Sequence, residues 1–391
     1  MYFAFGIGRR ALLQLGFVLL ALLLAACEPV AMGNGPSINP SKPIPVALLV
    51  PGGSGNAGDD IIAASLANAA RLAIADLDGV TIDLRVYNTA GNPEVASQMA
   101  RQAVQEGAKI ILGPVFAQNA AAVGNAVVSR NVNVLSFSNN PAIAGGNVFI
   151  LGPTFQNTAN RLVRFSVGRG KDRIMIIHGQ DAAEIAGRDA ITRAISLSGG
   201  TLAGITGFEL SQQGVINAVR DISREVRSSG AEAIFLTSGT SGALPFLAQL
   251  LPENGVDPKT VQYIGLQRWD VPASALTLPG LQNGWFALPD PQLNRNFAAR
   301  YAAAYGSNPH PIAGLAYDGI AAIGALAAQG KNDALTRAAL TQPAGFIGVN
   351  GVFRLLPDGT NQRGLAVATI QDNQVVIIDP APRSFGAGAG L

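Results

Sequence analysis

The sequence predicts an α/β protein made of two lobes, each built around a doubly wound parallel sheet. Short apolar stretches of mostly β-branched residues alternate with longer Ala-rich stretches of helical periodicity through most of the 391 residues. This alternation starts afresh near residue 150, which divides the chain into two similar halves. About 340 residues follow the N-terminal segments, which is enough for two lobes.

The first half is predicted to contain four β–α repeats. Each apolar strand is followed by a turn rich in Gly, Pro or Asn and then by a helix. Asn92 is expected to cap one of these helices, with Pro93 at its first position. Successive repeats of this kind favour a parallel sheet with right-handed crossovers. The predicted elements are strand 45–50, a helix from Asp59, strand 81–87, helix 93–106, strand 109–112, helix 118–130 and strand 132–137.

The second half repeats this plan and then ends in strands. Turns such as Pro357-Asp358-Gly359 separate the strands that we expect between residues 345 and 378. Residues 381–391 are expected to be a disordered tail. The predicted elements before them are helix 154–167, strand 173–178, helix 182–197, strand 201–209, helix 215–227, strand 232–237, helix 242–250, strands 261–266 and 284–288, and helices 294–305, 312–329 and 333–340.

The N-terminal segment has the pattern of an export signal. Arg9 and Arg10 precede an apolar run that ends at Cys27, and residues 24–27, Leu-Ala-Ala-Cys, resemble the bacterial lipobox. The resemblance implies a signal peptide over residues 1–26, lipidation of Cys27, and a periplasmic domain anchored to a bacterial membrane. Residues 27–44, rich in Pro, Gly, Asn and Ser, are predicted to be a flexible tether. A plain signal-anchor helix is the alternative, although the apolar run is short for a membrane span.

The composition excludes several classes of function. Cys27 is the only cysteine, and His178 and His310 are the only histidines, so we expect no metal site and no thiol chemistry. The 27 Lys and Arg residues against 25 Asp and Glu become 25 against 25 once Arg9 and Arg10 are removed with the signal. Nucleic-acid binding needs an excess of positive charge, so we expect no nucleic-acid partner.

A possible dinucleotide motif follows the first strand. Residues 53–58 read Gly-Ser-Gly-Asn-Ala-Gly, which fits G-x-G-x-x-G between a strand and a helix. The second strand, however, ends in Tyr87-Asn88 instead of the acidic residue that would bind a ribose. No nucleophile elbow or phosphate loop is present in the sequence. We therefore expect no cofactor and no enzymatic activity.

Polar residues gather at the predicted carboxyl ends of the strands. The stretch 109–119 is the clearest case, because a strand ends at Gly-Pro and leads into a helix whose first backbone N–H groups favour an anion such as a carboxylate. Two such edges that face each other would form a cleft between the lobes. The candidate ligand-binding residues are Ser54, Gly55, Gln118, Asn119, Ser136, Ser138 and Asn139 in the first half, and Thr240, Trp269 and Asp270 in the second.

The chain resembles the type I periplasmic binding proteins, the family of the leucine/isoleucine/valine-binding proteins. The likeness is carried by VALLVPGGSGNAGDD, by YNTAGNPEVASQMARQAVQEGAKIILGPVFAQNAAAV, by VNVLSFSNNPAI, and by RIMIIHGQDAAEIAGRDAITRAI with AYDGIAAIGALA further on. It implies two lobes joined by three crossings, near Gly152, Pro289 and Ala344. The first lobe would then comprise residues 45–151 and 290–343, and the second lobe residues 152–289 and 344–380.

The resemblance also implies a function. A small polar ligand, such as a branched-chain amino acid or an amide, would be captured between the closing lobes and delivered to an ABC permease. Its carboxylate would be held by Gln118, Asn119, Ser136 and Ser138. The sequence departs from the family pattern after residue 264, where Arg268 would repel an ammonium group and only Asp270 could offset it.

A second function remains open at this point. The chain also resembles the binding-protein-like domain of the lipoprotein activators of penicillin-binding proteins, which contact a peptidoglycan synthase instead of delivering a solute. The helical-repeat domain that precedes this fold in such activators is not found in the sequence. We therefore place solute binding first and synthase activation second.

Overall fold

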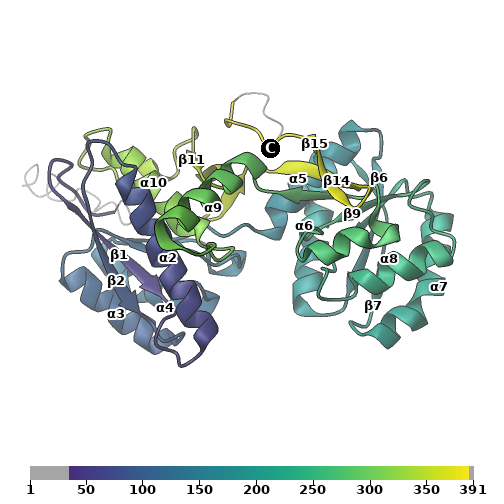
Figure 1. The fold of residues 1–391 in the computed structure, drawn as a ribbon, viewed down its shortest axis with the longest axis horizontal. Helices are drawn as coiled ribbons and strands as arrows, with labels where there is room; N and C mark the ends of the chain where they lie inside the picture. The colour runs from purple at the N-terminus through teal and green to yellow at the C-terminus, as the bar shows by residue number, and fades with distance from the viewer. Residues whose placement is uncertain (1–34, 387–391) are drawn as a thin grey trace, which may run out of the picture.

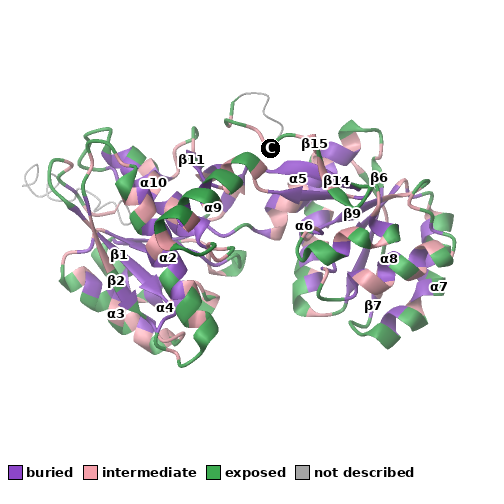
Figure 2. Ribbon diagram, viewed as in Figure 1, coloured by how far each residue is buried: buried purple, intermediate pink, exposed green. Residues whose placement is uncertain are grey.

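The computed structural model describes residues 35–386 and confirms the predicted fold class. Two α/β lobes lie side by side and are joined by crossings at the centre of the molecule (Figure 1). The strands in the middle of each lobe are buried, whereas the outer faces of the helices are exposed (Figure 2). Cys27 and the predicted signal peptide lie outside the described residues. Among the described helices, none is both long and apolar enough to cross a membrane.

The first lobe is organised around a five-stranded parallel sheet in the order β2-β1-β3-β4-β5. Alternate residues of β1 serve its two faces: Val46 and Leu48 pack with α2, α9 and α10, while Ala47 and Leu49 pack with α3 and α4. The strands are β1 (Ile44–Val50), β2 (Ile82–Asn88), β3 (Ile110–Leu112), β4 (Asn133–Ser136) and β5 (Val148–Ile150). The helices are α2 (Ala57–Ala75), α3 (Pro93–Gln105), α4 (Ala117–Val127), α9 (Pro291–Tyr305), α10 (Gly314–Ala327) and α11 (Arg337–Leu340).

Local sequence signals explain most of these boundaries. The side chain of Asn92 accepts hydrogen bonds from the backbone N–H groups of Glu94 and Val95, which confirms the predicted cap of α3. β5 was not predicted as a strand, because three apolar residues are too few to show a period. It becomes a strand only through its parallel pairing with β4.

The second lobe contains a seven-stranded sheet in the order β15-β14-β10-β9-β8-β6-β7. Its five parallel strands, β7-β6-β8-β9-β10, repeat the strand order of the first lobe, and β14 and β15 add an antiparallel edge. The strands are β6 (Arg173–Gly179), β7 (Thr201–Phe208), β8 (Ala233–Leu236), β9 (Gln262–Gly265), β10 (Trp285–Leu288), β14 (Ala366–Gln371) and β15 (Gln374–Asp379). The helices are α5 (Phe155–Gly168), α6 (Ala182–Ser198), α7 (Gln212–Ser229) and α8 (Leu244–Glu253).

A third, antiparallel sheet changes the predicted position of the last crossing. Strands β11 (Phe346–Gly348), β12 (Gly351–Leu355) and β13 (Asn361–Arg363) form this sheet. Phe346 and Phe353, with ring centroids 5.5 Å apart, belong to the core of the first lobe. The chain therefore crosses to the second lobe for the last time near Gly364, and not near Ala344 as the sequence predicted. Burial of the two phenylalanines against α10 is the physical reason.

Two segments predicted to be flexible pack against the folded lobes. Within the predicted tether 27–44, Ile38 is buried and its backbone N–H donates to the carbonyl of Asn332 at 2.9 Å. Within the predicted tail 381–391, the centroid of the Phe385 ring lies 4.8 Å from the guanidinium carbon of Arg354. These contacts correct the prediction for residues 35–44 and 381–386. The remaining residues of both segments lie outside the described range.

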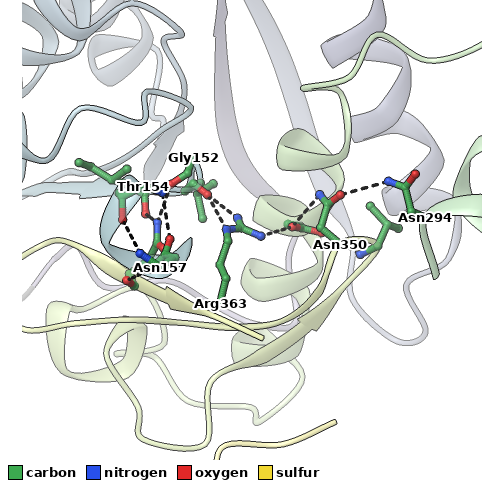
Figure 3. Close-up of polar contacts among 11 residues, drawn as sticks. Gly152, Thr154, Asn157, Asn294, Asn350 and Arg363 are labelled. Carbon is green, nitrogen blue, oxygen red and sulfur yellow. Dashed lines mark hydrogen bonds and ion pairs between the residues drawn. The ribbon is translucent and has the colours of Figure 1, made fainter. Parts of the chain in front are cut away.

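A buried ion pair holds the crossings together (Figure 3). Arg363 of β13 pairs with Asp318 of α10 at 3.2 Å, and both side chains are almost fully buried. The Arg363 Nε also donates to the carbonyl of Leu151, in the first crossing, at 3.1 Å. Asp318 accepts further hydrogen bonds from the Val349 N–H and the Asn350 amide. Burial raises the pKa of Asp318, and the charge of Arg363 counteracts this effect.

Hydrogen bonds at the start of α5 extend this network into the second lobe. Thr154 and Asn157 form a capping box, in which each side chain accepts from the backbone N–H of the other residue (Figure 3). The Asn157 amide donates to the carbonyl of Asn361 at 2.8 Å, and the Asn361 amide donates to the carbonyl of Gly152 at 2.9 Å. The first and third crossings are therefore tied to each other and to α5.

Candidate functional site

A cavity of about 320 Å³ lies where the two lobes meet the crossings. Pro311, Ile312 and Leu315 line it from the first lobe, and Phe155 and Leu266 are among its residues in the second. The other lining residues are Pro153, Thr154, Thr158, Gln267, Arg268, Ala287, Leu288, Pro289, Asn350, Arg363 and Leu365. Its lining is mostly apolar, with a few polar groups, which is typical of small-molecule sites.

The loops after β3 and β4 are held together by serine hydroxyls. The Ser136 Oγ donates to the carbonyl of Pro114 at 3.0 Å and accepts from the Ser138 N–H at 3.1 Å. The Ser138 Oγ accepts from the Asn140 N–H at 3.1 Å. Both serines are buried, whereas Asn139, which follows Ser138, is exposed. The serines thus shape the loop, and Asn139 presents its side chain to the surroundings.

The first turn of α4 contains two of the predicted binding residues, Gln118 and Asn119. Phe116, at the N-cap, provides no side-chain hydrogen bond to the helix. Gln118 is exposed, whereas Asn119 is 1% exposed and its Nδ2 has no hydrogen-bond partner among the described residues. Uncapped N–H groups and the helix dipole favour a negative group at this position.

The loops after β1 and β2 lie beside the start of α4. The Ser54 Oγ donates to Asp59 at 2.7 Å and accepts from the Asn56 N–H at 3.1 Å. A Cβ atom at Gly91 would lie 3.5 Å from the ring of Phe116 and 3.8 Å from the Cβ of Ser54. Gly55 is exposed and has a positive φ of 81°. Three loops of the first lobe therefore meet around Phe116, which is 38% exposed.

Glu184 is the residue of the second-lobe edge that the sequence did not reveal. It is 6% exposed and accepts hydrogen bonds from the Gly179 N–H at 2.7 Å, the Thr237 hydroxyl at 2.6 Å and the Ser238 hydroxyl at 2.8 Å. It thereby connects the ends of β6 and β8. In the sequence, Glu184 stands three residues after the N-cap Asp181, a spacing that indicates only the start of a helix and not these contacts.

Trp269 occupies a different place from the one predicted. It is fully buried in the core of the second lobe, with its ring centroid 6.0 Å from that of Phe286. Gly265 and Gly284 leave the room for the indole, since a Cβ at either position would lie within 2.3 Å of it. In this structure the ring therefore has no surface to offer a ligand.

The two other predicted residues of the second lobe are engaged locally. Asp270 forms a two-pronged pair with Arg268, through the Nε at 2.8 Å and an Nη at 2.5 Å. The Thr240 hydroxyl donates to the carbonyl of Val271 at 2.7 Å. The loop after β9 is thus neutralised and fixed by its own residues, while Arg268 remains part of the cavity lining.

His310 is the titratable group next to the lobe-1 wall of this cavity. Its Nδ1 accepts from the backbone N–H of Ile312 at 3.4 Å, and the backbone N–H of His310 donates to the Ser65 Oγ at 2.8 Å. Burial lowers the pKa of His310 below its ordinary value of 6.5. In the part of the chain that the structure describes, no group of three or more His, Cys, Asp or Glu residues is placed to hold a metal ion.

Comparison with known proteins assigns the family. A family model described as periplasmic binding protein matches residues 43–374, which is most of the chain. The chain belongs to the periplasmic binding protein family. A curated relative, an uncharacterized protein of Rickettsia prowazekii (strain Madrid E), is 23% identical over 240 residues. The match covers 59% of this chain and 62% of that relative.

Solved structures of similar fold extend the comparison. A putative branched-chain amino acid ABC transporter from Rhodospirillum rubrum has a TM-score of 0.73 at 18% identity, and the match covers 86% of this chain and 100% of that one. A substrate-binding protein from Desulfitobacterium hafniense in complex with Leu has a TM-score of 0.63 at 16% identity, with 86% and 100% covered. A solute-binding protein from R. palustris in complex with benzoate has a TM-score of 0.56 at 16% identity, with 89% and 99% covered. At these identities the likeness is one of fold.

Proposed function

We propose that the protein is an extracytoplasmic solute-binding lipoprotein of an ABC-type transporter, which captures a small polar ligand between two hinge-closing lobes. The observation that carries the proposal is the cavity of about 320 Å³, because both lobes and the crossings contribute to its lining. A ligand held there contacts both lobes and stabilises their closed arrangement. Family membership supports an extracytoplasmic location, and lipidation of Cys27 remains part of the proposal.

The acidic end of the ligand is assigned to the first turn of α4. The uncapped N–H groups there, the unpartnered Asn119 amide and the exposed Gln118 and Asn139 side chains all offer donors. Ser136 and Ser138 contribute indirectly, because their hydroxyls form the hydrogen bonds that hold the loops carrying these donors. None of these donors lines the cavity in this structure, so we propose that they reach the ligand as the lobes close, while its apolar part packs on Ile312 and Phe155.

The opposite end of the ligand is better served by a neutral polar group than by a free ammonium. Asp270 is paired with Arg268, and Glu184 already accepts from three donors. The partly exposed Arg268 guanidinium would also repel a cation. Among amino acids and their relatives, an amide or a carboxylate without an ammonium group therefore fits best.

The test is a thermal-shift screen of the full chain against amino acids, amides, small peptides and muropeptides. A compound that binds only the folded state raises the melting temperature, and at one hundred times its Kd it adds about 2.7 kcal/mol to the free energy of unfolding. Gln118→Ala should weaken binding of the compound found. Gln105→Ala, an exposed glutamine at the end of α3, is the matched control and should leave the affinity unchanged.

The second candidate function becomes the better one if no compound shifts the melting curve at saturation. The hydrogen bonds of Ser54, Asp270 and Glu184, in the loops and helix starts that follow the strands, favour this alternative, because they are satisfied without a ligand. The protein would then serve as a scaffold that activates a peptidoglycan synthase. An affinity that is equal in Gln118→Ala and in the parent protein would instead remove α4 from the site.

A further inference from the structure

A second cavity, of about 400 Å³, lies at the β15 edge of the second lobe. Its lining comes from α5 and from the end of β15 with the residues that follow it. In Figure 1 these two segments lie near the centre of the molecule. Its lining residues are Arg161, Arg164, Phe165, Gly168, Arg169, Asp379, Pro380 and Pro382. None of them lines the cavity between the lobes, so the two sites are separate.

Two of the three arginines lie against one aromatic ring. The guanidinium carbons of Arg161 and Arg169 lie 6.0 and 4.9 Å from the centroid of the Phe165 ring. The Phe165 ring is held in turn by an edge contact with Trp285, at a centroid distance of 4.9 Å. Arg161 is 8% exposed, and its Nε donates to the carbonyl of Leu365 at 2.7 Å. These contacts hold the charge of Arg161 beside the cavity before any ligand arrives, and the exposed Arg169 lies next to the same ring.

The third arginine has a donor that the described residues do not use. The Nη1 of Arg164 is buried and has no hydrogen-bond partner among residues 35–386. Burial lowers the pKa of Arg164, and the nearby charge of Arg161 lowers it further. This donor is out of reach of solvent, so an anion in the cavity recovers the cost of its missing partner only when the guanidinium rotates toward the cavity.

The charges of the lining are not balanced. Asp379 is its only acidic residue, and it pairs with Arg161 at 2.6 Å. Three guanidinium groups and one carboxylate leave a net charge of +2 around the cavity. Guanidinium groups donate in planar forks that match the oxygen atoms of phosphate, and several forks can bind one tetrahedral group.

We propose that this cavity binds a phosphate group carried by a small organic molecule or by a lipid headgroup. The net charge of +2 attracts a phosphate monoester dianion or the phosphodiester monoanion of a lipid headgroup, and the Arg164 guanidinium supplies the donor that lacks a partner. The volume exceeds the size of a phosphate ion, which leaves room for the organic part beside Pro380 and Pro382. The site is independent of the solute proposed for the cleft.

The experiment measures the melting temperature of the full chain in detergent micelles at constant ionic strength. Inorganic phosphate and glycerol 3-phosphate are compared with chloride, and micelles with phosphatidylglycerol are compared with micelles with phosphatidylcholine. The variant Arg164→Gln/Arg169→Gln removes two donors while it keeps the structural Arg161. The matched control is Arg220→Gln, which removes an exposed arginine charge from α7 in the same lobe, outside the cavity.

We expect phosphate or glycerol 3-phosphate to raise the melting temperature of the parent protein and of Arg220→Gln. In the double variant the affinity should fall about tenfold or more, because charge-assisted hydrogen bonds are lost. A shift with phosphatidylglycerol micelles that the double variant lacks identifies a lipid headgroup as the source, and a shift with the soluble esters alone identifies a free phosphate ester.

Two outcomes overturn the proposal. One is an equal shift in all three proteins, which would indicate general counter-ion binding, and the other is the absence of any shift in the parent protein. Binding of a cleft ligand by the double variant should equal that of the parent protein. Failure of this proposal therefore leaves solute binding in the cleft untouched, and failure of the cleft screen leaves this proposal standing.

Discussion

Protonation of His310 affects both the stability of the protein and one wall of the proposed site. Burial lowers its pKa below 6.5, so the unfolded chain takes up a proton at a higher pH than the folded chain. The contribution of His310 to the free energy of unfolding is therefore fully present above about pH 7, and it is lost as the pH drops through 6.5 toward the lowered pKa. Protonation of Nδ1 also removes the acceptor for the N–H of Ile312, which lines the cavity.

The variant His310→Gln should have a flatter pH dependence of stability. We expect its melting temperature to fall less than that of the parent protein between about pH 7.5 and pH 5.5, because glutamine does not titrate. Melting curves of both proteins across this range provide the measurement. Parallel curves for the two proteins would show that His310 is not the group that titrates.

Trp269 supports the fold at the scale of a single side chain. It is fully buried and packs with Phe286, so Trp269→Ala should lower the free energy of unfolding by about 3–5 kcal/mol. Urea unfolding followed by circular dichroism measures this loss. Thr240→Ala, which removes a partly exposed hydroxyl from the neighbouring loop, should cost far less. A loss in Trp269→Ala no larger than that of this control would contradict the burial of the indole.

At the scale of elements, the pair of Asp318 and Arg363 joins α10, β13 and the first crossing. Asp318→Asn leaves a buried guanidinium without its counter-charge, so we expect a loss of about 3–5 kcal/mol in the free energy of unfolding. Asp318→Asn combined with Arg363→Met should recover part of this loss, because neither charge then remains buried. Urea titrations of the single and double variants measure both effects.

The control for this pair is an exposed one. Arg224 and Asp221 on α7 also form an ion pair, but their side chains are 70% and 65% exposed. Asp221→Asn should change the free energy of unfolding by less than about 1 kcal/mol, because solvent screens the pair. Equal losses in Asp318→Asn and Asp221→Asn would mean that the crossings do not depend on the buried pair.

At the scale of the whole molecule, the two lobes are expected to close on the ligand. A compound identified by the thermal-shift screen should lower the radius of gyration of the full chain, measured by small-angle X-ray scattering. The value should fall toward the roughly 21 Å expected for a compact chain of 391 residues. Gln118→Ala at the same ligand concentration should remain more open. An unchanged radius at saturation would contradict hinge closure.

The two-lobe architecture could be predicted because it depends on local patterns. Apolar runs ended by Gly or Pro and helices begun by Asn92 or Thr154 are written in consecutive residues. The short strand β5 and the third sheet could not be predicted in this way. Their residues become strands, or join the first lobe, only through pairing and burial with segments that are distant in the chain.

The sequence predicted a cleft between the lobes, but none of the ten predicted ligand-binding residues lines the cavity that the structure has there. The carboxyl ends of the strands pointed to the loops at Ser54, Gln118 and Asn139. No pattern in the sequence indicated that Trp269 fills the core, that Arg268 neutralises Asp270, or that Glu184 joins β6 to β8. Side-chain partners of this kind depend on which loops meet in space.

By itself, the sequence determined the class of fold, and it predicted an export signal before Cys27 and ligand-binding loops at the edges of the sheets. Periodicity, turn residues and helix caps depend on residues that are close in the sequence, so they can be recognised without the structure. The tertiary structure alone decided the last crossing near Gly364, the buried pair of Asp318 and Arg363, and the arginine-lined cavity beside α5. Each of these joins residues from distant segments, and only the packed core brings them together.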